Sequence, residues 1–190
     1  MSTISTAPSM TSEELLALPD DGIEREIIRG QMREREMTTR NRRHSLATIR
    51  LGRFLDVWLD SQPPASGKVL GGDAAFRLSK NPETLVGIDL AFVSQEVSSR
   101  TPDSAFLIDG PPVLAVEILS PSDKHEDVVE KLQLYLESGV AVVWIVDPDL
   151  RHVTVYRPGK DEVHFAASQE LVGDPELPGF RVKVADLIAR

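Results

Sequence analysis

The chain has 190 residues, of which 41% are hydrophobic and 27% charged, and it carries a formal net charge of −9. These values are typical of one soluble globular domain. The sequence contains no cysteine, which excludes disulfide frameworks, thiolate zinc sites and cysteine nucleophiles. It also lacks an apolar run of the roughly 18 residues that a membrane span requires and a secretory signal. We therefore expect a cytoplasmic protein that does not contact a membrane, with residues 1–10 as a disordered leader and residues 11–190 as one domain.

Positive charge is concentrated in one stretch of this acidic chain. Nine of the fifteen arginines lie between Arg25 and Arg53, where only three glutamates oppose them, so the stretch carries +6 and the remainder −15. Arginine binds phosphate through paired hydrogen bonds. The overall negative charge argues at first sight against a nucleic-acid partner. Because of this basic stretch, both interpretations stay open: a nucleic-acid contact, or a surface whose arginines pair with acidic neighbours.

The first third of the chain predicts a short helix, a hairpin and a long helix. Thr11 and Glu14 have the spacing of a capping box before a short helix. Residues 26–32 predict a hairpin that turns at Arg29-Gly30. Residues 41–61 form the clearest helix, because apolar residues recur there at the helical period.

The remainder predicts strands around a second helix. Four strands are expected at residues 68–70, 74–78, 86–93 and 112–119. A helix follows, with Asp123 and Glu126 as its capping box and Gly139 as its end. The apolar residues 140–148 predict a strand buried on both faces, and residues 152–157 and 162–166 predict a hairpin. A short helical turn is expected from Val184 onwards. This order favours an α/β fold with a mixed β-sheet flanked by helices.

Two acidic residues interrupt predicted strands that are otherwise apolar. Strand alternation places Asp89 on the face of Ala91 and away from Ile88, and Glu117 on the face of Ala115. A buried ionised carboxylate has to be paired, neutralised or bound to a cation. Either each acid reaches solvent or an arginine, or the two bind a hard cation such as Mg²⁺, which accepts one or two carboxylates plus waters.

Lys131 and His44 are further candidates. Lys131 borders the apolar stripe of the second helix, where a lysine either extends towards water or points its ammonium at the sheet edge near Glu117. His44 opens the arginine-rich helix and is either a surface residue or part of a site. No HxH or HExxH spacing, phosphate-binding loop or GxSxG motif occurs, so the sequence argues against zinc proteases, P-loop proteins and serine hydrolases.

Several motifs between Thr11 and Leu187 occur together. They are Glu26-Ile27-Ile28-Arg29-Gly30, His44, Asp89, Gly110-Pro111-Pro112, Val116-Glu117-Ile118-Leu119-Ser120-Pro121-Ser122, Lys131 with Tyr135, and Gly139-Val140 before Trp144-Ile145-Val146-Asp147-Pro148. In this combination the chain resembles the Uma-two family of restriction endonuclease-like proteins, a branch of the PD-(D/E)XK nuclease superfamily. The resemblance implies a restriction-endonuclease-like fold with an N-terminal helix and hairpin and a C-terminal β-hairpin.

The same resemblance implies a metal-dependent endonuclease that hydrolyses DNA. Asp89 and Glu117 would bind Mg²⁺, or Mn²⁺ as a substitute, together with the carbonyl of Ile118. The superfamily lysine usually follows the glutamate by two residues, where this chain has Leu119, so Lys131 on the next helix is the candidate. Glu26 and His44 match family positions near the same site, and the proline that often precedes the aspartate is replaced by Ile88.

The resemblance also gives the arginine-rich stretch a function. Arg40, Arg42 and Arg43 would bind the DNA backbone. Glu117→Gln and Lys131→Ala are each expected to abolish cleavage while leaving the fold intact.

Two other interpretations stay open. The chain could be a catalytically silent nuclease fold that acts as an interaction or regulatory module, which its acidic charge favours. A glycosidase with two carboxylates is disfavoured, because aromatic residues make up only 5% and both tryptophans lie in apparent core segments. A homodimer is also plausible, with residues 140–146 or the C-terminal hairpin as its interface.

Overall fold

A mixed β-sheet forms the centre of the molecule. The computed structural model describes residues 9–36 and 41–188. The strands are β1 (Ile23–Ile28), β2 (Gln31–Glu36), β3 (Gly67–Lys80), β4 (Glu83–Ser94), β5 (Ile108–Asp109), β6 (Leu114–Ile118), β7 (Val142–Asp147), β8 (His152–Tyr156) and β9 (Val163–Ala166). Their order is β2-β1-β4-β6-β7-β8-β9, and β3 pairs with both β4 and β5. Among the strand pairs of the described residues, only β6 with β7 and β3 with β5 are parallel.

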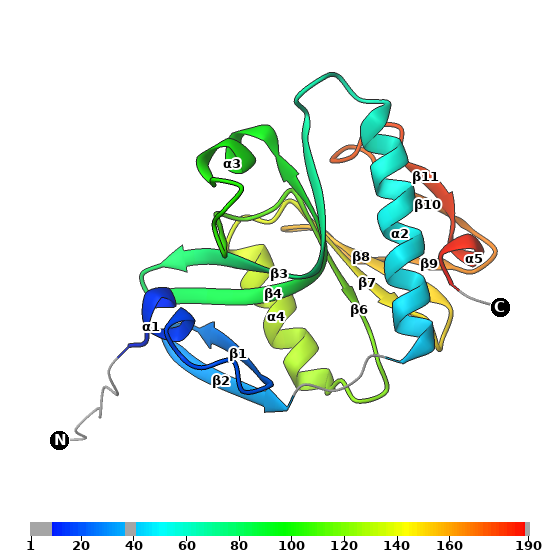
Figure 1. Cartoon of the computed structure of the whole chain (residues 1–190). Helices are drawn as coiled ribbons and strands as arrows, with labels where there is room; N and C mark the ends of the chain where they lie inside the picture. Colours follow the sequence, from blue (N-terminus) through cyan, green and yellow to red (C-terminus); the bar gives the residue numbers. More distant parts are fainter. Residues whose placement is uncertain (1–8, 37–40, 189–190) are drawn as a thin grey trace.

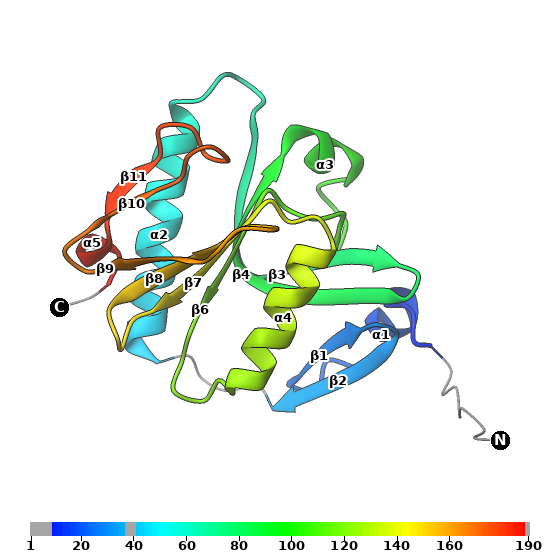
Figure 2. The same ribbon diagram turned by 180° about the vertical axis from the view of Figure 1, so that it is seen from behind.

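Two long helices cover opposite faces of this sheet. Helix α2 (Arg42–Asp60) lies on one face and helix α4 (His125–Glu137) on the other (Figures 1 and 2). The predicted mixed α/β fold with flanking helices is confirmed. Among the residues that the structure describes, no helix has both the length and the apolar character to cross a bilayer.

Helix α2 buries the apolar stripe that its sequence predicts. Asn41 caps its first turn, where its side chain accepts the His44 backbone N–H at 2.9 Å. Leu51 and Leu55 are buried against the sheet together with Trp58, whose ring meets Phe92 edge to face. This packing fixes the N-terminal end of α2, and hence His44, next to strand β4.

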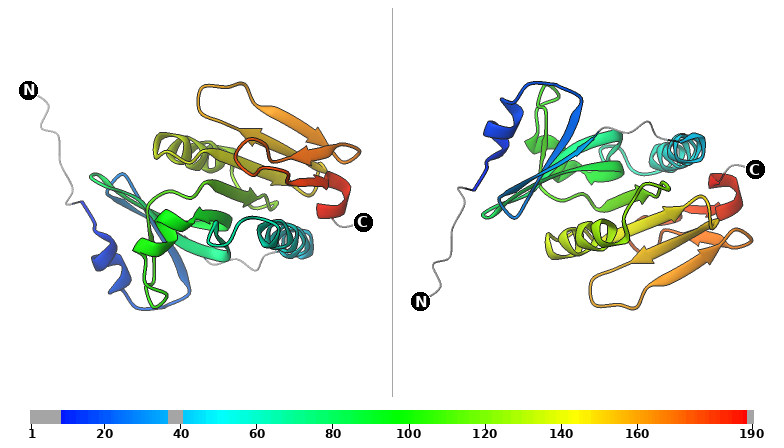
Figure 3. Two further views of the ribbon diagram at one scale, coloured as in Figure 1. Left: turned by 90° about the horizontal axis from the view of Figure 1, so that it is seen from above. Right: turned by 90° about the horizontal axis from the view of Figure 1, so that it is seen from below.

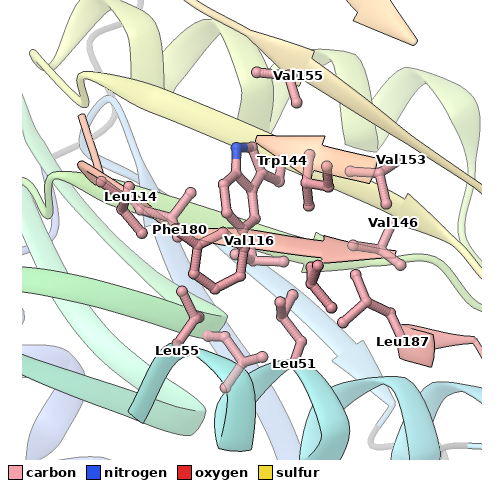
Figure 4. Packing of buried hydrophobic residues seen from close by; sticks show 14 of the residues in the cluster. Leu51, Leu55, Leu114, Val116, Trp144, Val146, Val153, Val155, Phe180 and Leu187 are labelled. Carbon is pink, nitrogen blue, oxygen red and sulfur yellow. The ribbon is translucent and has the colours of Figure 1, made fainter. Parts of the chain in front are cut away.

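A small C-terminal unit completes the core on the α2 side. It consists of β10 (Glu170–Val172), β11 (Arg181–Lys183) and α5 (Val184–Leu187). Phe180 packs against the fully buried Trp144 of β7, with Leu187 nearby (Figure 4). The predicted helical turn at Val184 is confirmed, whereas the β10–β11 pair has no counterpart in the prediction because its strands are only three residues long.

Most N-terminal elements form as predicted. Helix α1 (Ser12–Leu16) has the Thr11–Glu14 capping box. The β1–β2 hairpin turns at Arg29 and Gly30, which both have positive φ angles. The two strands expected at residues 68–70 and 74–78 are a single strand, β3, with a register irregularity between Gly71 and Ala74. Helix α3 (Gln95–Arg100) and strand β5 were not predicted.

The predicted capping box of α4 is wrong. The helix begins at His125 with Lys124 as its N-cap and no side-chain cap. The Asp123 carboxylate instead accepts the Ser120 backbone N–H at 2.7 Å, which stabilises the preceding turn. The predicted end is confirmed, because Gly139 follows the cap residue Ser138 with a φ of 91°.

Candidate active site at a fork in the sheet

The sheet divides at strand β4, and the candidate site lies at this division. One edge of β4 pairs with β1 at Leu85 and with β6 from Leu90 to Phe92. Between these two points, no described strand pairs with that edge. We call this opening the fork. Its free backbone groups at Gly87 are bound by side chains: the Glu26 carboxylate accepts the N–H at 3.1 Å, and the Lys131 ammonium donates to the carbonyl at 2.9 Å.

Asp89 lies at the fork between α2 and β6. Its Oδ2 accepts the Ile118 backbone N–H at 2.7 Å, and the His44 imidazole nitrogen Nε2 lies 3.3 Å from the same carboxylate. Both side chains are buried. Predicted alternation along β4 is wrong here, because Ile88 packs in the same cluster as Ala91. The register irregularity of β3 lies opposite Asp89, where β3 has one residue more than β4 and Gly72 and Asp73 have positive φ angles.

Glu117, Lys131 and Glu26 form a second group beside Asp89. The Lys131 Nζ lies 3.1 Å from Glu26 Oε1 and 3.4 Å from Glu117 Oε1. With the Gly87 carbonyl, these acceptors use all three N–H donors of the ammonium. The Tyr135 hydroxyl donates a hydrogen bond to the same Glu117 oxygen. One oxygen of Glu117 is therefore fixed from two sides by α4.

The electrostatics of this group follow from its burial and its excess of carboxylates. Burial raises the pKa of Glu117 to about 7, and the charges of Asp89 and Glu26 add to this, although Lys131 and Tyr135 oppose it. Burial disfavours the Lys131 ammonium, but Glu117 and Glu26 outweigh this and raise its pKa above the usual range. Burial and Glu117 raise the pKa of Tyr135 in turn. Lys131 is therefore charged at neutral pH and Tyr135 keeps its proton.

A test of this pH dependence compares the wild-type protein with Glu117→Gln in EDTA. Since the folded-state pKa of Glu117 exceeds its unfolded value of 4.5, folding favours the protonated form, and this contribution to stability is lost as the pH rises from about 4.5 to 7. We expect the wild-type free energy of unfolding to fall by about 3 kcal/mol relative to the variant across this range. Urea unfolding at several pH values measures it, and parallel pH profiles would contradict the burial of this charge.

A cleft of about 490 Å³ opens next to these groups. Asp89, Glu117, Ile118 and Lys131 all line it, whereas Glu26 and His44 do not and contact the site from behind. Its other charged lining residues are Glu24, Glu34, Arg35, Asp123, Lys124 and Asp127. Carboxylates therefore outnumber basic groups in the lining, a charge balance that attracts cations.

The arginine-rich stretch divides into two parts. On the β1–β2 hairpin, three arginines pair with acidic residues of α4: Arg29 with Glu137 at 2.8 Å, Arg33 with Glu130 at 3.6 Å and Arg35 with Asp127 at 3.1 Å. The fourth, Arg25, pairs with Asp21 and Glu34. The interpretation of arginines paired with acidic neighbours is therefore correct for the hairpin.

The second part of the stretch lies at the start of α2. Arg42 is exposed and forms no ion pair with any residue that the structure describes, whereas Arg43 pairs with Asp149. Arg40 lies outside the described residues. Of the two described residues in the predicted DNA-binding set, Arg42 is thus the one without an ion pair to a described residue.

Comparison with known proteins agrees with this architecture. The family model described as "Putative restriction endonuclease", Uma2, matches residues 12–185. The chain belongs to this family. No curated protein matches it. A similar solved structure is described as a "putative nuclease belonging to DUF820" from Anabaena variabilis ATCC 29413. The two chains share 20% identity and a TM-score of 0.78, with 94% of this chain and 97% of that chain covered.

In this Uma2 family member, the fold brings the site residues implied by the resemblance together at one place. Asp89, Glu117 and Lys131 lie around one cleft, with Glu26 and His44 directly behind them. Tyr135 is part of the predicted motif, but the sequence did not indicate its role, which is to bind the Glu117 carboxylate. Its position four residues after Lys131 places both side chains on one face of α4, and this spacing is the signal that could have identified it.

Proposed function

We propose that the protein is a metal-dependent nuclease that hydrolyses phosphodiester bonds of DNA at the fork. The observation that carries this proposal is the convergence of two carboxylates and one charged lysine, Asp89, Glu117 and Lys131, on a single open cleft. Family membership supports the reaction class. The DNA substrate, the metal and the individual roles are our inference from the chemistry of these residues.

The donor set fits a hard divalent cation. Three carboxylates at the fork, those of Glu26, Asp89 and Glu117, influence the single ammonium of Lys131, so negative charge remains in excess. No group of three or more histidine or acidic side chains within residues 9–36 and 41–188 is arranged to hold a metal ion. The protein would therefore supply only two carboxylates, Asp89 and Glu117, and the Ile118 carbonyl as ligands of Mg²⁺. Water would complete the coordination of the ion.

The chemistry that Mg²⁺ supplies when bound is Lewis acidity towards the phosphate and the attacking water. Lys131 cannot serve as a general base, because its raised pKa keeps it protonated. Its longest contact, 3.4 Å to Glu117, is the one it can most easily exchange for a phosphate oxygen. Lys131 would then stabilise negative charge at phosphorus, while Tyr135 continues to hold Glu117.

His44 and Glu26 have positioning roles in this proposal. His44 lies against the Asp89 carboxylate, and Glu26 binds both the Lys131 ammonium and the Gly87 N–H. Neither lines the cleft. They would hold the acid and the lysine in place without contacting the substrate.

Simultaneous replacement of Arg40, Arg42 and Arg43 by alanine is expected to weaken DNA binding. Each lost phosphate contact should reduce the slope of log affinity against log salt concentration by about one. Fluorescence anisotropy with a labelled duplex at several salt concentrations measures this slope. A matched control replaces Arg100, Arg181 and Lys183 on other exposed surfaces with the same change in net charge. If both triple variants bind alike, the start of α2 is not the DNA contact.

The proposed activity is tested with supercoiled and linear DNA in the presence of Mg²⁺, Mn²⁺ or EDTA. We expect metal-dependent cleavage by the wild-type protein, and no cleavage by Asp89→Asn. Calorimetric titration with Mn²⁺ gives an independent measure of metal binding by the same two proteins. Absence of both cleavage and Mn²⁺ binding in the wild-type protein would contradict the proposal.

The acidic lining of the cleft favours a second candidate, a silent nuclease fold that acts as an interaction module. Carboxylates outnumber basic groups around the cleft, and the hairpin arginines already pair with α4. Such a protein has no need of a bound metal. Mn²⁺ binding that disappears in Asp89→Asn would therefore favour the enzyme over this module.

A further inference from the structure

The outer face of α2 carries exposed apolar side chains. Ile49 is 68% exposed and Val57 is 59% exposed, and both lie on the side of the helix opposite the buried stripe of Leu51 and Leu55. No described element covers this side of α2 (Figures 1 and 3). These two β-branched side chains lie about two turns apart on one helix face, with Arg53 between them.

The charges on this face are arranged in two halves. In chain order this face carries Arg50 and Arg53 near the middle of α2 and then the exposed Asp56 and Asp60 towards its C-terminal end. None of these four side chains forms an ion pair with another residue that the structure describes. The face is therefore basic at one end and acidic at the other, with its charges available to a partner.

We propose that α2 of one chain packs antiparallel against α2 of a second copy, with a two-fold axis near Arg53. Ile49 and Val57 lie four residues on either side of position 53, and Arg50 and Asp56 lie three residues on either side. Antiparallel pairing about this position therefore brings each Ile49 to the Val57 of the other copy, and each Arg50 to the opposite Asp56. The face is therefore complementary to itself at positions 49, 50, 56 and 57, whereas the two Arg53 side chains meet at the axis, where their like charges weaken the pairing.

The same charges disfavour other occupants of this face. Asp56 and Asp60 would repel a DNA backbone along its C-terminal half, and a uniformly acidic or basic protein would meet like charge at one end. The interface predicted at residues 140–146 is wrong, because strand β7 is buried inside its own chain, with Val142 and Trp144 completely inaccessible. The α2 pairing does not depend on nuclease activity.

The expected dimer is weak and sensitive to salt. A helix of 19 residues is about 28 Å long, and one such helix pair buries less than the roughly 1,200 Å² of a standard interface. Two exposed ion pairs add little and are screened by salt. We therefore expect a dissociation constant in about the micromolar range.

Cysteine cross-linking tests the pairing and its register. Because the chain has no cysteine, single-cysteine variants are specific probes. Mildly oxidised Arg53→Cys should form a disulfide-linked dimer, since position 53 faces itself across the axis. A mixture of Ile49→Cys and Val57→Cys should cross-link more than either variant alone. Phe106→Cys, on an exposed loop, is the control for random collision. Cross-linking at the level of this control, or equal yields for Ile49→Cys alone and for the mixture, would overturn the proposal.

A charge exchange tests the interface without cross-links. Sedimentation velocity at low salt should show dimers of the wild-type protein, and Arg50→Asp should raise the dissociation constant about tenfold or more. The double variant Arg50→Asp with Asp56→Arg restores opposite charges and should recover dimerisation. These surface positions leave the fold unchanged, which circular dichroism verifies. A wild-type protein that stays monomeric at about 1 mM, far above the expected constant, or a double variant no better than the single one, contradicts the proposed pairing.

Discussion

Replacement of Glu117 by glutamine is expected to abolish metal-dependent DNA cleavage, with a loss on the order of a hundredfold or more. The amide has nearly the shape of the carboxylate and can still accept the Tyr135 hydrogen bond. It lacks the negative charge that would hold the cation beside Asp89. The variant should therefore fold normally and fail at metal binding, so cleavage and Mn²⁺ affinity should decrease together.

Glu126→Gln is the matched control for this variant. It makes the same chemical change on the first turn of α4, at an exposed position that does not line the cleft. Cleavage rates at saturating Mn²⁺ and calorimetric Mn²⁺ affinities are measured for both variants. If the Glu117→Gln protein cleaves DNA as fast as the control, Glu117 has no role in catalysis.

Replacement of Lys131 by methionine is expected to abolish cleavage and also to destabilise the fold. Lys131 is 13% exposed, and its ammonium binds Glu26, Glu117 and the Gly87 carbonyl. Without it, two buried carboxylates lose their counter-charge, which typically costs about 3–5 kcal/mol. From the sequence we expected Lys131→Ala to leave the fold intact. Because of these contacts, we now expect the loss of Lys131 to lower the stability of the fold.

The pH dependence identifies the origin of this loss. Without the ammonium, the stability of the variant should fall more steeply between pH 5 and pH 8 than that of the wild-type protein, because protonation of Glu117 at acid pH removes one of the unpaired charges. Urea unfolding in EDTA measures the difference. Lys124→Met is the control, since Lys124 is an exposed lysine at the same cleft without an ion pair to any described residue. Equal stability of the two variants at pH 8 would show that the Lys131 ion pairs contribute nothing to folding.

Local patterns were sufficient to predict the elements that position the site. Periodic apolar residues located α2, the pair Arg29-Gly30 located the hairpin turn, and isolated acids in apolar strands identified Asp89 and Glu117. Each of these signals depends on residues that are close in the sequence. The start of α4 was misplaced for a related reason, because Asp123 has two competing N–H groups nearby and only the folded turn selects that of Ser120.

Long-range features could not be obtained in this way. The pairing of Arg35 with Asp127 joins residues of β2 and α4 that are far apart in the sequence. The division of the sheet depends on which strands meet β4 at Leu85 and Leu90. Ile88 packs in the cluster of Ala91 opposite the irregularity in β3, where Gly72 and Asp73 have positive φ angles, and alternation along β4 alone does not predict this.

The fork has a consequence for how relatives of this protein could lose activity. The Gly87 backbone is bound by the side chains of Glu26 and Lys131, in the place where a neighbouring strand would normally supply the hydrogen bonds. A chain that no longer cuts DNA would still need partners for this N–H and carbonyl. Selection for folding alone would then preserve the lysine, so its presence in a relative is weak evidence of an enzyme. The same holds for Asp89, whose carboxylate accepts the Ile118 backbone N–H. Glu117 lines the cleft and is bound by the side chains of Lys131 and Tyr135, so it is a better indicator of activity.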